Sequence, residues 1–303
     1  MSNTTVNLRR LVGNAEDLQS VVRTMKAMAA TSIGQYENSV LSLQDYYRTV
    51  ELALGACIRG VGSTALGDGS TSNRRPAAIG AIVFGSDQGL VGQFNDTVAD
   101  CAIKTLAGLP AGPLVWAVGE RVHARLVDAG LEMQGLFNVP NSVQGITALV
   151  GRLQLDSESI LAADPAAHIY VFHNRPRPGA LYRSSSQKLL PLDKSWRASL
   201  ATVSWPTGML PEILGASNAT LQSLIREYLF ISLYQASAES LAAENACRLA
   251  AMERADKNID GMLGNLRLQL NQLRQADIDE ELFDLISGFE ALAEADEDIY
   301  AGG

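Results

Sequence analysis

Proline is missing from both ends of this 303-residue sequence. All ten prolines lie between Pro76 and Pro211. Proline interrupts helices because its ring clashes with the preceding turn and its nitrogen cannot donate a hydrogen bond. The two ends are therefore free to form long helices, whereas the middle of the chain is not.

Cysteine and histidine are scarce. The three cysteines are Cys57, Cys101 and Cys247. Their odd number and wide spacing indicate neither a disulfide framework nor a metal cluster. We expect them to be buried or partly buried apolar residues. Of the three histidines, His168 and His173 fall on one predicted strand, where a spacing of five places them on opposite faces. We expect no metal site.

Long apolar runs and common catalytic motifs are also missing. Polar residues interrupt every apolar stretch before the ~18 to 20 residues that a membrane-spanning helix needs. A hydrophobic content of 47% with 19% charged residues is typical of a water-soluble globular protein, and a net charge of -9 argues against nucleic-acid binding. No nucleophile elbow or zinc-protease helix occurs. The amino terminus has no leader character, so we expect a cytoplasmic, bacterial protein.

The amino-terminal segment carries a heptad pattern. Its apolar positions alternate at spacings of three and four, which is typical of a coiled-coil helix: Leu8, Leu11, Ala15, Leu18, Val22, Met25, Ala29, Ile33, Tyr36, Val40, Leu43, Tyr47, Val50 and Leu54. Two consecutive spacings of four, at Met25, Ala29 and Ile33, resemble a stutter that relaxes the supercoil. We expect the twist to change there.

The carboxyl-terminal segment repeats the pattern over a longer stretch. Its apolar positions are Leu224, Tyr228, Ile231, Leu249, Met252, Ile259, Met262, Leu266, Leu270, Leu273, Ile278, Leu282, Leu285, Phe289 and Leu292. Helices this long with narrow apolar stripes bury them against each other, so we expect an antiparallel pair. Gly261 and Gly264 are unusual inside a helix, and they indicate close helix approach or local torsional softness.

The middle of the chain has a different pattern. Short apolar runs at Ala78–Phe84, Leu114–Val118 and Ile169–Phe172 predict buried strands. Helix-like segments lie between them and predict a mostly parallel sheet with covering helices: Asn95–Leu106, Gly119–Ala129 and Ser142–Ala162. Gly60–Arg75 and Arg175–Ser186 read as loops. We therefore expect a coiled-coil helix at 1–59, an inserted Rossmann-like α/β domain at 60–216, and a second coiled-coil helix with an acidic tail at 217–303.

One local string stands out, Ser86–Asn95 (SDQGLVGQFN), between a predicted strand and a predicted helix. Phosphates often bind at such turns. The string lacks, however, the Gly-Lys-Ser/Thr of a P-loop and the G-x-G-x-x-G of a dinucleotide loop. We favour a structural turn in which Gly89 and Gly92 allow the bend and Ser86 or Asn95 satisfies free backbone groups.

Four segments together resemble one family, the gamma subunit of rotary ATP synthases. Val21–Ala30 (VVRTMKAMAA) is similar to the family's I-T-K-A-M-x-M-V-A-A. Ser86–Asn95 is similar to S-D-K/R-G-L-C-G-G-F/Y-N. Ser240–Met252 resembles S-L-x-S-E-x-A-A-R-M-x-A-M, and Asn271–Gly288 resembles N-x-x-R-Q-A-x-I-T-x-E-L-x-E-I-V-x-G-A. The departures that indicate a divergent branch include Val22, Ser32, Gln88, Val91, Gln93 and Asp279.

The resemblance implies a non-catalytic central rotor with no cofactor. It implies a coiled coil inside a ring of alpha and beta subunits, and an α/β domain that contacts the epsilon subunit and the membrane c-ring. It also implies that the chain is a peripheral protein on the cytoplasmic face of the bacterial inner membrane. It also assigns the rotor-ring coupling contacts to Met25, Glu244, Arg248, Arg274, Gln275 and Glu281.

Two other classes of function stay open on the sequence alone. Heptads equally predict a coiled-coil adaptor or scaffold unrelated to rotation, which would bind helical partners instead of a nucleotide-binding ring. A nucleotide-using enzyme with its site at Ser86–Asn95 would bind its ligand through the central domain.

Overall fold

The computed structural model of the chain describes residues 3–61, 78–110, 112–164, 167–192 and 217–301, with single residues and pairs between 196 and 212. Side chains are described within these ranges except at 3, 60, 61, 217, 218 and 288–301. Most of the predicted loop Gly60–Arg75 lies outside the described residues, as do the side chains of the acidic tail.

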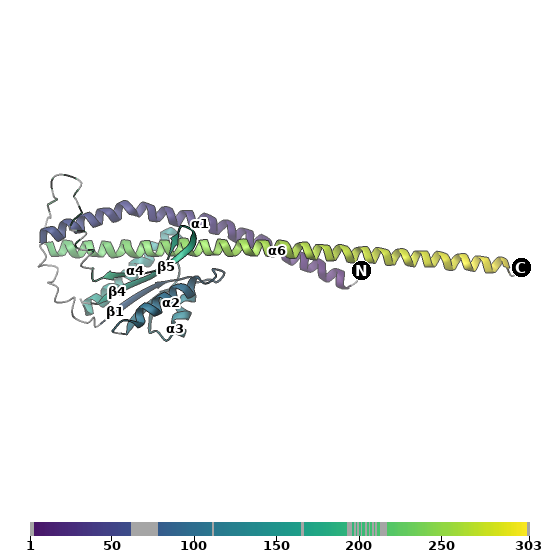
Figure 1. Cartoon of the computed structure of the whole chain (residues 1–303), viewed down its shortest axis with the longest axis horizontal. Coiled ribbons are helices and arrows are strands. Elements are labelled where there is room, and N and C mark those ends of the chain that lie inside the picture. Colours follow the sequence, from purple (N-terminus) through teal and green to yellow (C-terminus); the bar gives the residue numbers. More distant parts are fainter. Residues whose placement is uncertain are drawn as a thin grey trace. The chain divides into compact units, whose positions relative to one another are not determined.

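Two long helices form the ends of the chain, as the absence of proline predicts. Helix α1 spans Asn3–Val61 and helix α6 spans Ser217–Ala301, a length of 85 residues (Figure 1). The chain divides into two compact units, each containing part of both helices. We call Met1–Ala27 with Met252–Gly303 the shaft unit, and Met28–Ala251 the domain unit. The three-part division at residues 59 and 216 stays a prediction.

The domain unit contains a five-stranded sheet in the order β3-β2-β1-β4-β5. Strands β1 (Ile79–Phe84), β2 (Pro113–Val118), β3 (Met133–Phe137) and β4 (His168–Arg177) are parallel, and β5 (Ala180–Leu190) is antiparallel to β4. Every residue of the central strand β1 is buried. The mostly parallel sheet is therefore confirmed.

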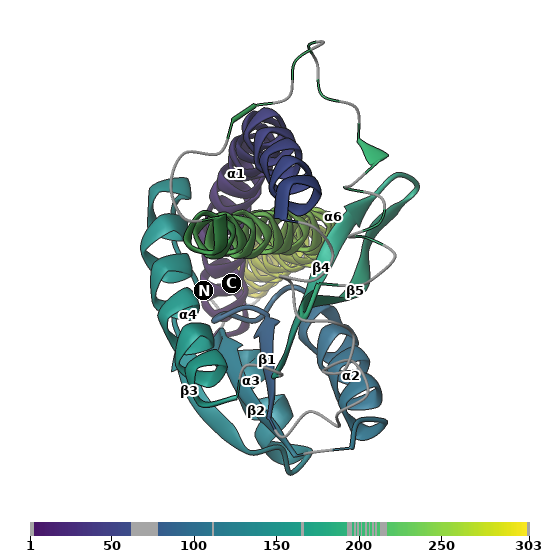
Figure 2. The same ribbon diagram turned by 90° about the vertical axis from the view of Figure 1, so that its left-hand side faces the viewer.

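Helices cover both faces of the sheet (Figure 2). Helices α2 (Phe94–Ala107) and α3 (Glu120–Asp128) pack on one face, against residues such as Ala81 and Val83. Helix α4 (Val143–Ala163) and the domain-unit part of α6 pack on the other, against Ile82 and Phe84. The successive residues of β1 thus alternate between two cores, which is the arrangement of a doubly wound α/β domain.

Two strands were not predicted. The sequence analysis assigned Arg175–Ser186 to a loop, and this was wrong, because β4 continues to Arg177 and β5 begins at Ala180. The error has a physical reason: β5 is an edge strand whose serines replace apolar alternation with polar contacts, such as the 2.6 Å hydrogen bond from Ser184 Oγ to Asn174 Oδ1. β3 is short and contains Gly135, which weakens its strand signal.

The two long helices run antiparallel in both units. In the domain unit, the Tyr46 hydroxyl donates a 2.7 Å hydrogen bond to Glu227, and Tyr47 packs on Tyr228 with ring centroids 6.3 Å apart. In the shaft unit, Glu16 pairs with Arg267 and Lys26 with Glu253. In the domain unit, Tyr36 lies near Glu244 while Tyr46, further along α1, contacts Glu227, so the residue number rises along α1 while it falls along α6. The same holds in the shaft unit, from the Glu16–Arg267 pair to the Lys26–Glu253 pair.

The seam of the shaft unit follows only part of the predicted pattern. Ala15, Val22 and Ile259 are buried as predicted, at 7%, 6% and 5% exposed. Leu11 and Leu18 were assigned to it, yet their side chains are about half exposed, at 48% and 52%. Gln19 is buried instead and donates a hydrogen bond to Asp256 of α6. On α6, Leu263 is 4% exposed whereas the predicted Met262 is 47% exposed. Spacing alone therefore identified one of the two seam positions in each heptad and misplaced the other.

Gly261 and Gly264 do not mark a close approach of the two helices. A Cβ atom added at either position would meet no described atom within 4 Å. Of the two explanations proposed from the sequence, close packing within this chain is therefore wrong. Local torsional softness stays a prediction, as does the change of twist near Ala29, which lies beside the boundary between the two units.

Candidate functional surface of the shaft and its junction with the sheet

The shaft unit is held together by a thin seam and a row of ionic contacts. Val22, Ile259 and Leu263 are buried between the helices. Beside them, Arg23 Nε lies 3.3 Å from Asp256, and Arg267 lies 2.6 Å from Glu16. These pairs are largely exposed, so each stabilises the unit by about 1 kcal/mol or less. The buried apolar residues therefore carry most of the pairing energy.

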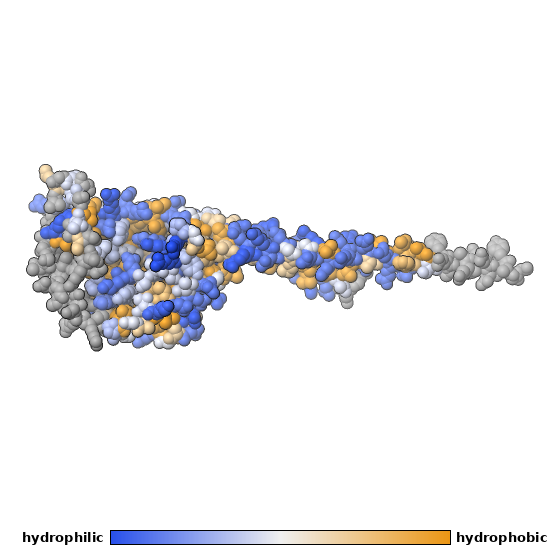
Figure 3. Space-filling view, in the orientation of Figure 1, coloured by the Kyte–Doolittle hydropathy of each residue, from blue (hydrophilic) through white to orange (hydrophobic). Residues whose placement is uncertain are grey.

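Large apolar side chains beside this seam are exposed to solvent. They lie on both helices and on the end of α6: Leu11, Leu18, Val21, Met262, Leu268, Ile278, Leu282, Phe283, Leu285 and Ile286. Figure 3 shows apolar residues recurring along the shaft unit. A soluble chain rarely exposes so many large apolar groups unless a partner covers them. We call this set the apolar flank of the shaft.

Four of the six residues assigned to rotor-ring contacts lie in the shaft unit. Met25 is half-buried, whereas Arg274, Gln275 and Glu281 are exposed. Arg274 and Glu281 share one helix face because they are seven residues apart. These four residues form no hydrogen bond or ion pair with one another in the described part of the chain. Their side chains are nevertheless available to a partner.

The other two, Glu244 and Arg248, are joined inside the domain unit. Arg248 Nη2 lies 2.6 Å from Glu244 Oε1, and Glu244 is only 4% exposed. Burial raises the pKa of Glu244, the Arg248 charge opposes that rise, and Asp87 adds to it. Tyr36 of α1 lies close enough for Glu244 to help raise its pKa, after burial itself. The pair therefore stands between α1 and the Ser86–Asn95 motif, away from solvent.

The Ser86–Asn95 motif is a structural turn, as favoured from the sequence. Asn95 Oδ1 accepts a 2.9 Å hydrogen bond from Ser86 N, and Asn95 Nδ2 donates one of 2.8 Å to the Ser86 hydroxyl. The carboxylate of Asp87 accepts from Glu120 N, at the start of α3, and from Val139 N. Gly92 has a φ of 62°, which glycine adopts without strain.

The same motif attaches the sheet to α6. Val91 and Phe94 are buried against Ala243 and Cys247 of α6. Tyr182 of β5 completes the cluster, with its ring 5.6 Å from that of Phe94 in an edge-on arrangement.

Two of the three cysteines, Cys57 and Cys247, are buried and Cys101 is half-buried, as predicted.

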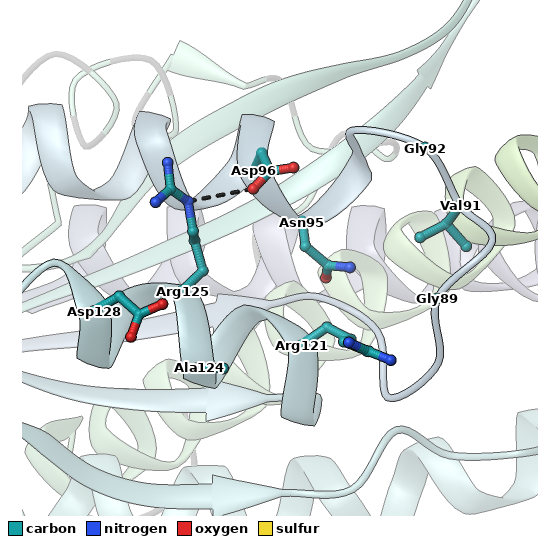
Figure 4. A pocket seen from close by; sticks show the side chains of 9 residues that line it. All are labelled: Gly89, Val91, Gly92, Asn95, Asp96, Arg121, Ala124, Arg125 and Asp128. Atoms are coloured by element: carbon teal, nitrogen blue, oxygen red, sulfur yellow. Dashed lines mark ion pairs between the residues drawn. The ribbon is translucent and has the colours of Figure 1, made fainter.

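A pocket of about 370 Å³ opens beside the motif (Figure 4). It is lined by Gly89, Val91, Gly92, Asn95, Asp96, Arg121, Ala124, Arg125 and Asp128. Arg125 is engaged by Asp96 at 3.2 Å and by Asp100 at 3.6 Å. Carboxylates at the start of α2 repel a phosphate. The pocket is therefore poorly suited to a nucleotide.

A buried ionic cluster that sequence reasoning missed lies on the opposite side of β4 from α2. Glu239 of α6 accepts hydrogen bonds from His173 Nε2 at 2.9 Å, Arg175 Nε at 2.8 Å and Gln235 Nε2 at 2.8 Å. Burial alone raises the pKa of Glu239, but the hydrogen bonds from His173, Arg175 and Gln235 outweigh it and lower the pKa to about 2. The cluster fastens α6 to the sheet.

Glu239 should make the domain unit sensitive to acid. Its pKa falls from an ordinary value near 4.5 to about 2, so its stabilising contribution is complete above pH 4.5 and is lost as the pH falls toward 2. This lowering of the pKa corresponds to about 3 kcal/mol of folding free energy. We expect a contribution of about 2 kcal/mol, because Arg175 is 52% exposed and solvent screens its charge. Glu239→Gln should lower the free energy of unfolding by that amount at pH 7 and flatten its acid dependence in urea titrations.

The matched control for this prediction is Glu253→Gln. Glu253 pairs with Lys26 at 3.8 Å, with side chains 52% and 38% exposed. We expect a change below about 0.5 kcal/mol. Equal effects of the two substitutions would contradict the role of the Glu239 cluster.

The fold described above, a long antiparallel helix pair that carries a doubly wound domain, defines a class of stalk-like proteins. A family model described as ATP synthase matches residues 4–292. ATP synthase gamma chains from Desulforudis audaxviator and Dechloromonas aromatica are 27% and 24% identical over 300 and 295 residues, each covering 94% of this chain and 98% of the relative.

Solved structures share the fold. The rotor of the Euglena gracilis mitochondrial ATP synthase matches with a TM-score of 0.58 at 14% identity, covering 91% of this chain and 99% of that one. The central stalk of the Tetrahymena thermophila enzyme matches with a TM-score of 0.52 at 19% identity, over 78% of this chain and 99% of that one. The chain belongs to the ATP synthase gamma-subunit family.

Proposed function

We propose that this chain is the central rotor of a rotary ATP synthase and couples ion translocation through the membrane sector to ATP synthesis or hydrolysis by rotation. The observation that carries the proposal is the apolar flank of the shaft, which two helices alone leave exposed. A surrounding ring of alpha and beta subunits accounts for that exposure. The epsilon subunit and the c-ring are the proposed partners of the domain unit.

Such a rotor needs no catalytic group of its own. A shaft that presents a different face to each catalytic subunit biases chemically identical subunits toward different open and closed states. Family membership places this chain among the non-catalytic subunits of the complex. The chain associates with a membrane-bound complex, and no helix in its described part combines the length and apolar character of a membrane span. We place it peripherally, on the cytoplasmic face of a bacterial inner membrane.

The burial of the six assigned residues suggests two roles. Met25, Arg274, Gln275 and Glu281 are accessible for direct contact with the ring. Glu244 and Arg248 are buried within the chain, so they act by holding α6 beside α1 and the Ser86–Asn95 motif. Transmission of torque therefore combines contact residues on the shaft with positioning residues where α6 meets the sheet.

Alanine at both Arg274 and Gln275 tests the contact role. Both side chains are exposed in this chain, so their removal leaves its stability within about 0.5 kcal/mol. Losing two polar contacts of about 1.5 to 3 kcal/mol each should lower coupled ATP synthesis by about tenfold or more. The measurement is ATP synthesis by reconstituted vesicles. The control is alanine at Gln269 and Gln272, which are also exposed and match no fixed position of the family segment.

Failure of the chain to copurify with alpha and beta subunits would refute the rotor itself. Unchanged synthesis in an assembled complex that carries both alanines would refute only the assignment of Arg274 and Gln275. A coiled-coil adaptor would instead copurify with helical partners and without a nucleotide-binding ring.

A further inference from the structure

The β4–β5 hairpin carries more positive charge on one face than the chain neutralises. Arg175 and Arg183 are direct cross-strand partners, and Arg177 follows two residues after Arg175. Directly opposed residues of antiparallel strands lie on the same face with Cβ atoms about 5 Å apart, and like charges at this distance are destabilising. Glu239 pairs with Arg175, but neither Arg177 nor Arg183 has an ion pair with any described residue. We call these three residues the arginine face of the hairpin.

This surplus stands out in an acidic protein. The whole sequence carries a net charge of -9, yet the arginine face holds three guanidinium groups and contacts one carboxylate. All three arginines are exposed, as is Leu181 beside them, at 49%. The strongly hydrophilic surface in the middle of the domain unit in Figure 3 lies where Figure 1 places β5. Glu239 compensates the charge of Arg175, whereas Arg177 and Arg183 have no ion pair in the described part of the structure.

We propose that the arginine face binds a carboxylate-bearing protein segment of another subunit in the assembly, an inference that rests on the proposed rotor function. Planar guanidinium forks match carboxylates in paired hydrogen bonds. Two or more carboxylates on one short segment would neutralise Arg177 and Arg183 together. Leu181 supplies an apolar contact next to them. The partner segment is therefore acidic, with an apolar residue beside its carboxylates.

A protein partner fits this face better than a lipid surface does. Recognition of anionic lipids relies on clusters of about four to eight basic residues. The arginine face presents three, one of which is already paired with Glu239. Its arginines are also fixed by strand register, and two prolines, Pro176 and Pro178, precede the turn at Gly179. Three guanidinium groups at fixed positions are suited to binding a defined set of carboxylates.

Zero-length cross-linking in the assembled complex tests the proposal. Arg177→Lys and Arg183→Lys each retain the positive charge and introduce an amine that a carbodiimide couples to a contacting carboxylate. We expect a cross-link to another subunit from at least one variant, mapped by mass spectrometry to an acidic segment and reduced at high salt. Ser186→Lys is the matched control, because Ser186 is exposed on β5 and three residues from Arg183, on the opposite face.

The stability of the free chain gives a second readout. Arg183→Gln removes repulsion from Arg175 and should raise the melting temperature by up to about 2 °C, while it weakens the intersubunit contact about tenfold. A lower melting temperature would indicate a structural role for Arg183 and overturn the inference.

Two further outcomes would also overturn it. One is an intact complex in which neither lysine variant gives an intersubunit product, and this leaves the rotor function standing. The other is binding to lipid: the full chain sediments with vesicles of equal parts phosphatidylserine and phosphatidylcholine, and the double variant Arg177→Gln, Arg183→Gln does not. That result would identify a membrane surface as the partner instead. Loss of copurification with the ring, by contrast, would refute the rotor function itself.

Discussion

Leu263→Asp is expected to separate the two helices of the shaft unit, whereas the same change at the adjacent Met262 leaves them paired. Leu263 is 4% exposed in the seam, and Met262 is 47% exposed beside it. An aspartate at Leu263 loses the burial of a leucine, worth about 2 kcal/mol, and places a carboxylate in the buried seam, three residues from Asp260. We expect a total cost above about 3 kcal/mol of pairing free energy.

Hydrogen exchange measures this difference directly. Amides of α1 between residues 5 and 22 should lose protection in Leu263→Asp and keep it in Met262→Asp, because local opening governs their exchange. The domain unit provides an internal reference, since its amides should be unaffected in both variants. Equal protection in the two variants would mean that the seam does not run through Leu263.

Gly119→Ala is expected to destabilise the sheet of the domain unit strongly, for two reasons: the positive φ at Gly119 and a clash with neighbouring backbone. Gly130→Ala is the comparison, because it places an alanine at a positive φ without a clash. Both glycines have positive φ, 112° at Gly119 and 78° at Gly130. A Cβ atom at Gly119 would lie 2.8 Å from the backbone of Ser86, whereas one at Gly130 meets nothing within 4 Å. A positive φ costs alanine about 1 to 2 kcal/mol in the left-handed helical region, and more at Gly119, whose φ of 112° and ψ of 132° lie outside that region. A backbone clash, which flexible side chains cannot relieve, should bring Gly119→Ala above about 3 kcal/mol.

Urea titration followed by tryptophan fluorescence would measure both variants, because Trp116 lies on β2 in the core of the sheet. Gly119 follows the last residue of β2 and donates its N–H to Phe137 O on β3, while Ser86 O accepts from Arg121 N at the start of α3. The clash should therefore displace the Ser86–Asn95 motif. Similar losses of stability in the two variants would show that the close approach of Gly119 to Ser86 is unimportant.

The long helices and the mostly parallel sheet could be predicted because their signals are repeated. Proline is absent over whole segments, and spacings of three and four recur many times. Only some seam positions could be predicted: Ala15 and Val22 are buried as expected, whereas Leu11 and Leu18 are exposed. The choice between adjacent stripes depends on the facing helix, where Asp256 selects Gln19. Contacts between residues so far apart in the chain produce no repeating pattern that a single sequence could reveal.

The site was only partly predictable for a related reason. The pairing of Glu244 with Arg248 follows from a spacing of four on one helix. Glu239 meets His173 and Arg175 across 66 and 64 residues of sequence, so no local pattern marks them. The arginine face was likewise hidden, since Arg175–Ser186 was taken for a loop and cross-strand register cannot be assigned within a loop. Whether Met25, Arg274, Gln275 and Glu281 contact a ring stays a prediction.

The continuity of α6 has a consequence for how this chain can change during evolution. One residue inserted into a helix rotates everything beyond it by about 100° and advances it by about 1.5 Å. In an 85-residue helix that contributes to both units, such an insertion near Ser232 would turn Leu263 out of the seam. Substitutions are absorbed far more readily, which fits relatives that share only 24% to 27% identity yet align over 94% of the chain. Length variation should therefore be confined to the connections between elements, or enter α6 in whole heptads.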